Sequence, residues 1–292
     1  MRSSIFVLAL LGAGSLAAIS SAHTPLNTPA EVLRESTGPV IAVHGDLPDP
    51  AAFTRVLREV VVVPNVDYSR LEANRGGLDR YLAELAATDP ARLSAAPRDD
   101  QLAFWINAYN ACMLRVVIDH YPIERQRLGL FQRARIAVAG YPANSVWQIR
   151  DVFDGKHCEV AGAPRSQDEI EHEIIRPRFG EPRIHFAVNC AARSCPVLWP
   201  EAYTGERLEE QLERAVRNLV GNPAHFRVVA ENGPELRLNK VLDWYSEDFG
   251  GVEGLRTFFL TYLEGETLAQ VRDPATPIRF FDYDWTLNDT SR

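Results

Sequence analysis

The stretch Arg183-Ile-His-Phe-Ala-Val-Asn-Cys-Ala-Ala-Arg-Ser-Cys-Pro196 combines an alternating apolar pattern with two cysteines. Apolar residues occupy every second position after Arg183, which is the period of a β-strand. The final proline has no backbone N–H to donate and ends strand pairing there. We therefore predict a strand from Ile184 to Asn189, followed by a polar loop that presents the thiols of Cys190 and Cys195.

An earlier apolar stretch is typical of a central, buried helix. Apolar residues lie nearly all round the helix from Leu102 to about Asp119, and Asp99-Asp100 supplies an N-cap and an acidic first turn. Within this helix Asn107 and Asn110 are three residues apart and share one surface. Since buried amides need hydrogen-bond partners, they predict an internal polar network that either holds a neighbouring loop or supports catalysis.

Between these two stretches, Ser166-Gln-Asp-Glu169 is a capping box, in which each side chain bonds the backbone of the other residue. It predicts a short helix from Glu169 to Arg176, which Pro177 ends. His172 and Arg176 lie one turn apart on this helix and share a face.

Helices and strands mix along the rest of the chain without strict alternation or an internal repeat. We therefore predict an α+β fold, a single mixed domain with the central buried helix packed on a mainly antiparallel sheet. Further helices are expected near 51–59, 78–87, 206–220, 242–249 and 254–263, and strands near 60–63, 135–138, 146–149, 226–229, 235–238 and 278–281, with a hairpin turn at Asn232-Gly233.

The N-terminal residues predict a cleavable signal peptide over residues 1–22. Arg2 precedes an apolar core, and Ser20-Ser-Ala22 fits a small-x-small cleavage site. Residues 23–50 are expected to be a flexible lead-in, and 51–292 the single domain. No later apolar run is long enough to span a membrane. We therefore expect an exported protein, periplasmic or secreted.

Composition and charge narrow the function further. The chain has 292 residues, 46% hydrophobic and 24% charged, which is ordinary for a globular protein. Its formal net charge of −8 argues against a nucleic-acid partner. An oxidising compartment permits disulfides, and four cysteines allow three pairings, among them a small loop closed between the last two. The cysteines are Cys112, Cys158, Cys190 and Cys195.

Four stretches together resemble the family known as domain of unknown function 547. The combination in this order is specific, whereas each piece alone is weak, and the core match covers about residues 93–203. The chain resembles an exported bacterial member with a single domain. The stretches are Phe104-Trp-Ile-Asn-Ala-Tyr-Asn-Ala111, Ile170-Glu-His-Glu-Ile-Ile-Arg176, Ile184-His-Phe-Ala-Val-Asn-Cys190 with Cys195-Pro196, and Tyr283-Asp-Trp-Thr-Leu-Asn288.

The resemblance implies a likely site but no settled reaction. The family pattern has asparagine at Asn107 and Asn110, Glu-His at Glu171-His172, and usually cysteine at Cys190. The residues at Cys195 and His185 vary among plant members. The resemblance therefore favours Cys190 over Cys195 and His172 over His185.

The first functional hypothesis is thiol-dependent acyl chemistry, meaning hydrolysis or transfer at an amide or thioester of a small-molecule or peptide substrate. Such a reaction needs a thiolate, a base, a group that orients the base, and donors for the oxyanion. Cys190 is the candidate nucleophile and His172 or His185 the base, with Glu171, Asn107 or Asn110 in the supporting roles. Papain-like and transglutaminase-like enzymes use a similar set, although their nucleophile usually precedes the histidine.

Geometry argues against one of these bases. In a regular strand, His185 and Cys190 would lie on opposite faces, because five residues separate them. His172 lies on another element and is not constrained in this way.

Two alternatives remain open. In a non-catalytic binding or scaffold domain, the same polar residues would form a structural network and the last two cysteines a disulfide. A zinc site is less favoured, because no strong ligand spacing links the candidates, and we expect no cofactor or metal. The candidate zinc ligands are His157, Cys158, His172, His185, Cys190 and Cys195.

Overall fold

The central element of the fold is α5 (Arg98–Ile118), which confirms the predicted buried helix. The computed structural model describes residues 47–123, 129–229 and 233–291, all within one compact unit. The predicted signal peptide and most of the lead-in, residues 1–46, lie outside the described residues. Every residue of α5 from Leu102 to Leu114 is buried. Pro97 is the N-cap, so the predicted Asp cap is wrong, but Asp99 and Asp100 do lie in the first turn.

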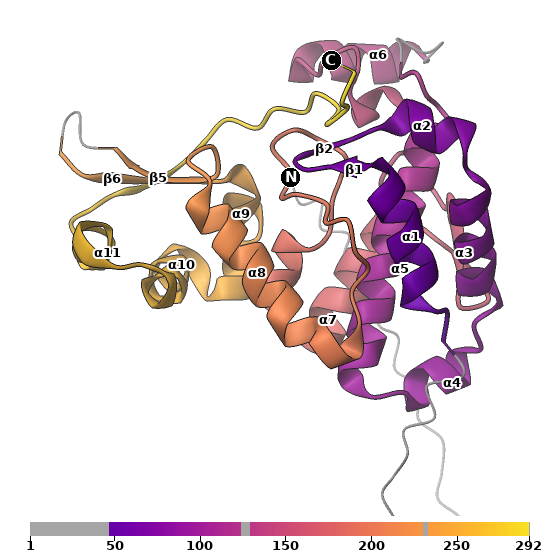
Figure 1. Ribbon diagram of the computed structural model, residues 1–292. Helices are drawn as coiled ribbons and strands as arrows, with labels where there is room; N and C mark the ends of the chain where they lie inside the picture. Colours follow the sequence, from indigo (N-terminus) through magenta and orange to yellow (C-terminus); the bar gives the residue numbers. More distant parts are fainter. Residues whose placement is uncertain (1–46, 124–128, 230–232, 292) are drawn as a thin grey trace, which may run out of the picture. The chain divides into compact units, whose positions relative to one another are not determined.

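Helical elements surround α5 on several sides (Figure 1). Their apolar faces join one core that includes Phe53, Leu78 and Ile106. The elements in contact with α5 are α1 (Pro50–Val60), α2 (Tyr68–Ala73), α3 (Gly76–Ala87), the π-helical segment η2 (Glu169–Ile175) and the 3₁₀ turn η4 (Gly205–Arg207).

The strands of the described chain form small separate sheets, which confirms the mixed α+β class. Two are antiparallel pairs, and in the third β6 pairs antiparallel with β5 and parallel with β7. The β5–β6 pairing confirms the predicted hairpin, whose Gly233 has a φ of 99°, while Asn232 lies outside the described residues. The strands are β1 (Val61–Val62), β2 (Asn65–Val66), β3 (Cys158–Val160), β4 (Ala163–Arg165), β5 (Phe226–Val229), β6 (Glu235–Leu238) and β7 (Ile278–Phe280).

Two predicted strands are helical instead. Residues 135–138 belong to α6 (Leu130–Ala139), which ends at Gly140 in the left-handed conformation. Residues 146–148 form the 3₁₀ turn η1 (Val146–Gln148), because the Ser145 hydroxyl accepts a hydrogen bond from Trp147 N and starts a turn there. The other helices are α4 (Pro90–Ala95), α7 (Arg176–Phe179), α8 (Leu208–Gly221), α9 (Lys240–Trp244), η5 (Ser246–Phe249), α10 (Gly251–Phe259), η6 (Leu260–Tyr262) and α11 (Gly265–Arg272).

The strand predicted from Ile184 to Asn189 is also wrong. This segment forms the 3₁₀ helix η3 (Pro182–Phe186) and then an irregular run. Proline at its start and the Glu181 side chain, which accepts from Arg183 N at 3.1 Å, favour a helical turn. Its alternating apolar residues have different destinations: Ile184 joins the core around α5, and Phe186 joins a second core built by α8, α10 and the β5–β6–β7 sheet.

A disulfide between Cys112 and Cys158 joins the middle of α5 to β3, and the two cysteines have a sequence separation of 46. This is one of the pairings that the sequence left open. Cys190 and Cys195 are not joined to each other by a disulfide.

Removing this disulfide should destabilise the fold. In the chain-entropy estimate, a loop of this length contributes about 4 kcal/mol to the free energy of unfolding. The double variant Cys112→Ala/Cys158→Ala should lose roughly that amount in urea unfolding monitored by circular dichroism. As a control, a reductant should lower the stability of the unaltered protein but not that of the double variant. Equal stability of the two proteins without reductant would contradict the assigned pairing.

Candidate functional site

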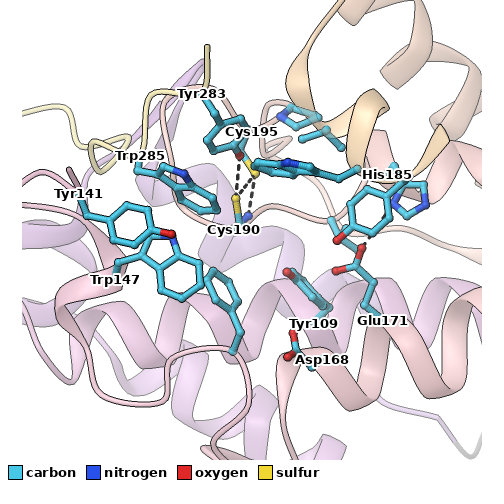
Figure 2. A pocket seen from close by; sticks show the side chains of 16 residues that line it. Tyr109, Tyr141, Trp147, Asp168, Glu171, His185, Cys190, Cys195, Tyr283 and Trp285 are labelled. Carbon is cyan, nitrogen blue, oxygen red and sulfur yellow. Dashed lines mark hydrogen bonds and ion pairs between the residues drawn. The ribbon is translucent and has the colours of Figure 1, made fainter. Parts of the chain in front are cut away.

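A cavity of about 370 Å³ lies beside the thiol loop and is lined largely by aromatic side chains (Figure 2). Its walls come from α5, the loop around η1, η2, η3, α9 and the C-terminal segment. Glu171, His185 and Cys190, three of the six predicted site residues, line it together with Cys195. Asn107, Asn110 and His172 do not line it.

The two free thiols are in direct contact at one wall of the cavity. Cys190 Sγ lies 2.6 Å from Cys195 Sγ, and the backbone N–H of Cys190 donates to Cys195 Sγ at 2.9 Å. Tyr283 OH is 3.1 Å from Cys190 Sγ. Between the cysteines, Ala191 adopts the left-handed conformation, with φ of 61°, which turns the loop back on itself.

The C-terminal segment holds this loop in place. Backbone hydrogen bonds join Arg193 N to Thr286 O at 2.8 Å and Asn288 N to Ala191 O at 3.1 Å. These pairings explain how Tyr283, some ninety residues later, reaches the thiols.

The environments of the two thiols are unequal. Burial raises the pKa of Cys190, and its contact with Cys195 raises it further. Burial also acts to raise the pKa of Cys195, but hydrogen bonds from the Cys190 thiol and backbone, Tyr283 and the backbone of Ala192 outweigh it, so the pKa of Cys195 is lowered. The proton that the pair shares is therefore favoured on Cys190, and the thiolate on Cys195.

A buried histidine lies between two carboxylates elsewhere in the cavity wall. His185 Nε2 is 2.7 Å from Asp248 Oδ2, and His185 Nδ1 is 3.4 Å from Glu171 Oε1. Its ring stacks on Tyr245, with centroids 3.9 Å apart. Hydrogen bonds from His185 and from Arg176 hold the pKa of Asp248 well below its usual range.

Glu171 is buried, yet its carboxyl group favours the charged form. Burial alone would raise its pKa, but the close contact and charge of His185, the charge of His172 and the hydroxyl of Tyr245 lower it. Glu171 thus pairs with His185, which comes from a different element. The next residue in the sequence, His172, does not line the cavity. The side chain of His172 is 36% exposed and its Nδ1 lies 3.2 Å from Arg176 Nη1, the pair expected on one helix face.

The geometric argument against His185 as a base does not hold, because it assumed a regular strand. In the 3₁₀ turn the His185 ring reaches the cavity that Cys190 also lines. Even so, the hydrogen-bond partners of the two sulfur atoms among the described residues include no histidine. The catalytic roles of His185, His172 and Cys190 stay predictions.

The two asparagines of α5 bind loop backbones. Asn107 accepts from Tyr203 N and donates to Tyr203 O, both at 2.8 Å. Asn110 accepts from Asn189 N at 2.9 Å and donates to Ala187 O at 3.0 Å. These contacts give the side-chain oxygen and nitrogen of both asparagines a hydrogen-bond partner. They also anchor the chain on both sides of the thiol loop.

The candidate metal ligands are not gathered into one site. Cys158 is bonded to Cys112, and within the described ranges there is no group of three His, Cys, Asp or Glu side chains arranged to hold a metal ion. Nor does any helix of the described chain have the length and apolar character needed to cross a membrane.

Residues 93–220 match the family described as "Protein of unknown function, DUF547". The match supports the DUF547 family for this segment of the chain. No curated protein and no solved structure matches it. Both thiols, Glu171 and His185 lie inside the DUF547 match, whereas Tyr245, Asp248 and Tyr283 come from the chain beyond it.

Several cavity residues were not predicted as site residues. Tyr283 and Trp285 belong to the closing stretch that resembles the family, and this resemblance was the sequence feature that could have indicated them as site residues. Tyr245 and Trp147 in the cavity wall, and Asp248 beside His185, have no local motif, because only the folded chain brings them to this site.

The pH dependence of alkylation should report the thiolate on Cys195. Since its pKa is lowered, iodoacetamide should modify Cys195 at pH values below the ordinary thiol range, and Cys190 only at higher pH. Tyr283→Phe removes a hydrogen bond that lowers the thiol pKa, so it should move the labelling curve to higher pH. Mass spectrometry of each cysteine peptide measures this. Tyr141→Phe, a cavity residue without a recorded contact to sulfur, is the control, and an equal shift in both variants would contradict the assignment.

Replacing Asn110 should destabilise the fold itself. Asn110→Ala leaves the buried Ala187 O and Asn189 N without partners, at a cost of about 2–4 kcal/mol in the free energy of unfolding. The exposed Asn74→Ala should cost less than about 0.5 kcal/mol. Urea unfolding measures both values, and an unchanged stability of Asn110→Ala would argue for a role other than support.

Proposed function

We propose that this chain is a cysteine-dependent acyl hydrolase or transferase that acts on an amide or thioester. The observation that carries the proposal is the asymmetric thiol pair, with its thiolate favoured on Cys195, in the wall of a cavity that also contains the carboxylate-held His185. Thiolates are strong nucleophiles at neutral pH when neighbouring groups lower their pKa. The export predicted from the N-terminal residues belongs to the same proposal.

In the proposed reaction, the thiolate of Cys195, rather than of Cys190, which the family resemblance favours, attacks the carbonyl carbon of the substrate. A carbon–sulfur bond forms and negative charge develops on the carbonyl oxygen. The bond to the leaving amine or thiol then breaks, and the acyl group remains on Cys195. Water releases it as an acid in a hydrolase, and another nucleophile accepts it in a transferase.

His185 is the proposed proton carrier. Asp248 and Glu171 hold the ring in one orientation. In this role His185 protonates the leaving group and later takes a proton from the attacking water. Glu171 and His185 precede the thiols in the sequence, so the order differs from that of papain-like enzymes, and the likeness to them stays an analogy.

A non-catalytic binding domain is the second candidate. It is favoured by the absence of a histidine from the hydrogen-bond partners of the two sulfurs in the described chain, and by the structural contacts of Asn107 and Asn110. In that case the cavity holds a ligand and the thiols remain unmodified by acyl donors.

Acylation by a simple thioester separates the two candidates. The protein is incubated with the phenylacetyl thioester of N-acetylcysteamine, and the acyl group is located by peptide mass spectrometry. We expect a single acyl group on Cys195. His185→Gln should still be acylated but should hydrolyse the thioester about 10²-fold to 10⁴-fold more slowly, the usual contribution of a general acid–base group.

Two matched variants test whether the acyl group is attached to Cys195. Cys195→Ser should abolish the adduct, whereas Cys190→Ser should retain it. Recovery of Cys190 and Cys195 as one disulfide-linked peptide from the native, unreduced protein would exclude Cys195 as the nucleophile, because no free thiolate would be present. An absence of any adduct on the reduced protein would favour the binding domain.

A further inference from the structure

Glu171 brings a buried negative charge to the cavity wall. The residue is only 6% exposed, and its Oε1 has no partner within hydrogen-bonding geometry among the described residues. This oxygen lies 3.4 Å from His185 Nδ1 and forms an ion pair with it when the ring is protonated. Figure 2 shows the Glu171 carboxylate directed into the cavity beside Tyr109. An ionised carboxylate has more acceptor sites than the one that faces His185, so a ligand that donates to the group would add a hydrogen bond.

The opposite wall of the cavity offers aromatic faces. Trp147 stacks on Tyr141 with ring centroids 4.9 Å apart and meets Trp285 edge to face at 5.3 Å. Figure 2 places these three rings across the cavity from Glu171, with the thiols between the two groups. Aromatic faces bind flat apolar groups, and they also attract cations.

The charged residues that line the cavity favour a positively charged ligand. Asp168 adds a second carboxylate, half exposed, to the Glu171 side. No lysine or arginine occurs among the described residues that line the cavity, and the nearby Arg176 is engaged by Asp248 at 2.7 and 2.8 Å. A carboxylate or phosphate ligand would therefore lack a cationic partner other than His185, whereas an ammonium group would have a charged acceptor.

We infer that the cavity binds a substrate that carries a primary ammonium group and an aromatic ring, with the ammonium on Glu171 and the ring against Trp147 and Trp285. This inference rests on the proposed function, since it takes the cavity as the substrate site. It adds the substrate class: an amino-bearing acyl compound, whose reacting carbonyl lies near Cys195 between the two ends.

Three probes of equal length test the charge preference in the unaltered protein. They are 3-phenylpropylamine, 3-phenyl-1-propanol and 3-phenylpropionate, and binding is followed by isothermal titration calorimetry and by the fluorescence of the cavity tryptophans. The amine should bind about tenfold or more tightly than the alcohol, as expected for a hydrogen bond between charged groups, and the acid should bind most weakly. Equal binding of the three, tighter binding of the acid, or no binding of the amine at millimolar concentration would overturn the inference.

A matched pair of variants assigns the preference to Glu171. Glu171→Gln keeps the shape of the side chain and should remove most of the preference for the amine over the alcohol. Glu173→Gln on the same helical segment is exposed and should keep it. A preference that survives in Glu171→Gln would overturn the assignment, and the comparison in the unaltered protein needs no variant to fold.

The outcome is independent of the acylation experiment, because none of the probes carries a reactive carbonyl. Acylation of Cys195 without a preference for the amine would leave the proposed enzyme standing and remove the substrate class. A preference for the amine without acylation would keep the ligand class and favour the binding domain.

Discussion

The hydrogen bonds of Asn110 with the backbone of Ala187 and Asn189 are the constraint on which the site depends. They fasten the segment that leads into the thiol loop to the most deeply buried helix of the fold. Asn107 does the same for Tyr203 on the far side of the loop. Unsatisfied amides inside an apolar core are costly. The two asparagines therefore fix the position of the loop relative to the core.

The loop becomes a chemical site only through a distant part of the chain. Residues 284–288 pair with the loop backbone, and this pairing brings the Tyr283 hydroxyl to Cys190. The same thiols without these neighbours would have ordinary buried environments, in which desolvation raises the pKa of both. The lowered pKa of Cys195 therefore results from tertiary hydrogen bonds that outweigh burial.

The cavity separates three kinds of chemistry in space. The thiol pair lies between the aromatic rings on one side and the Glu171–His185 pair on the other (Figure 2). In the proposed enzyme, this separation lets recognition of a ring and of a charge position a carbonyl group at the sulfur, so that binding energy serves orientation. The same walls would serve a simple binding domain, which is why reactivity and affinity have to be measured separately.

Local patterns in the sequence determined the buried helix α5, the capping box at Ser166 and the β5–β6 hairpin, because each depends on residues close together in the chain. The match to the DUF547 family depends instead on the order of several stretches along the chain. The segment from Ile184 to Asn189 was misread as a strand, since its alternating apolar residues divide between two cores that no local pattern reveals. Tertiary structure alone decided that Glu171 pairs with His185 rather than with its neighbour His172, and that Cys195 is the thiol with the lowered pKa. Both outcomes depend on distances between elements far apart in the sequence, and such distances follow from packing.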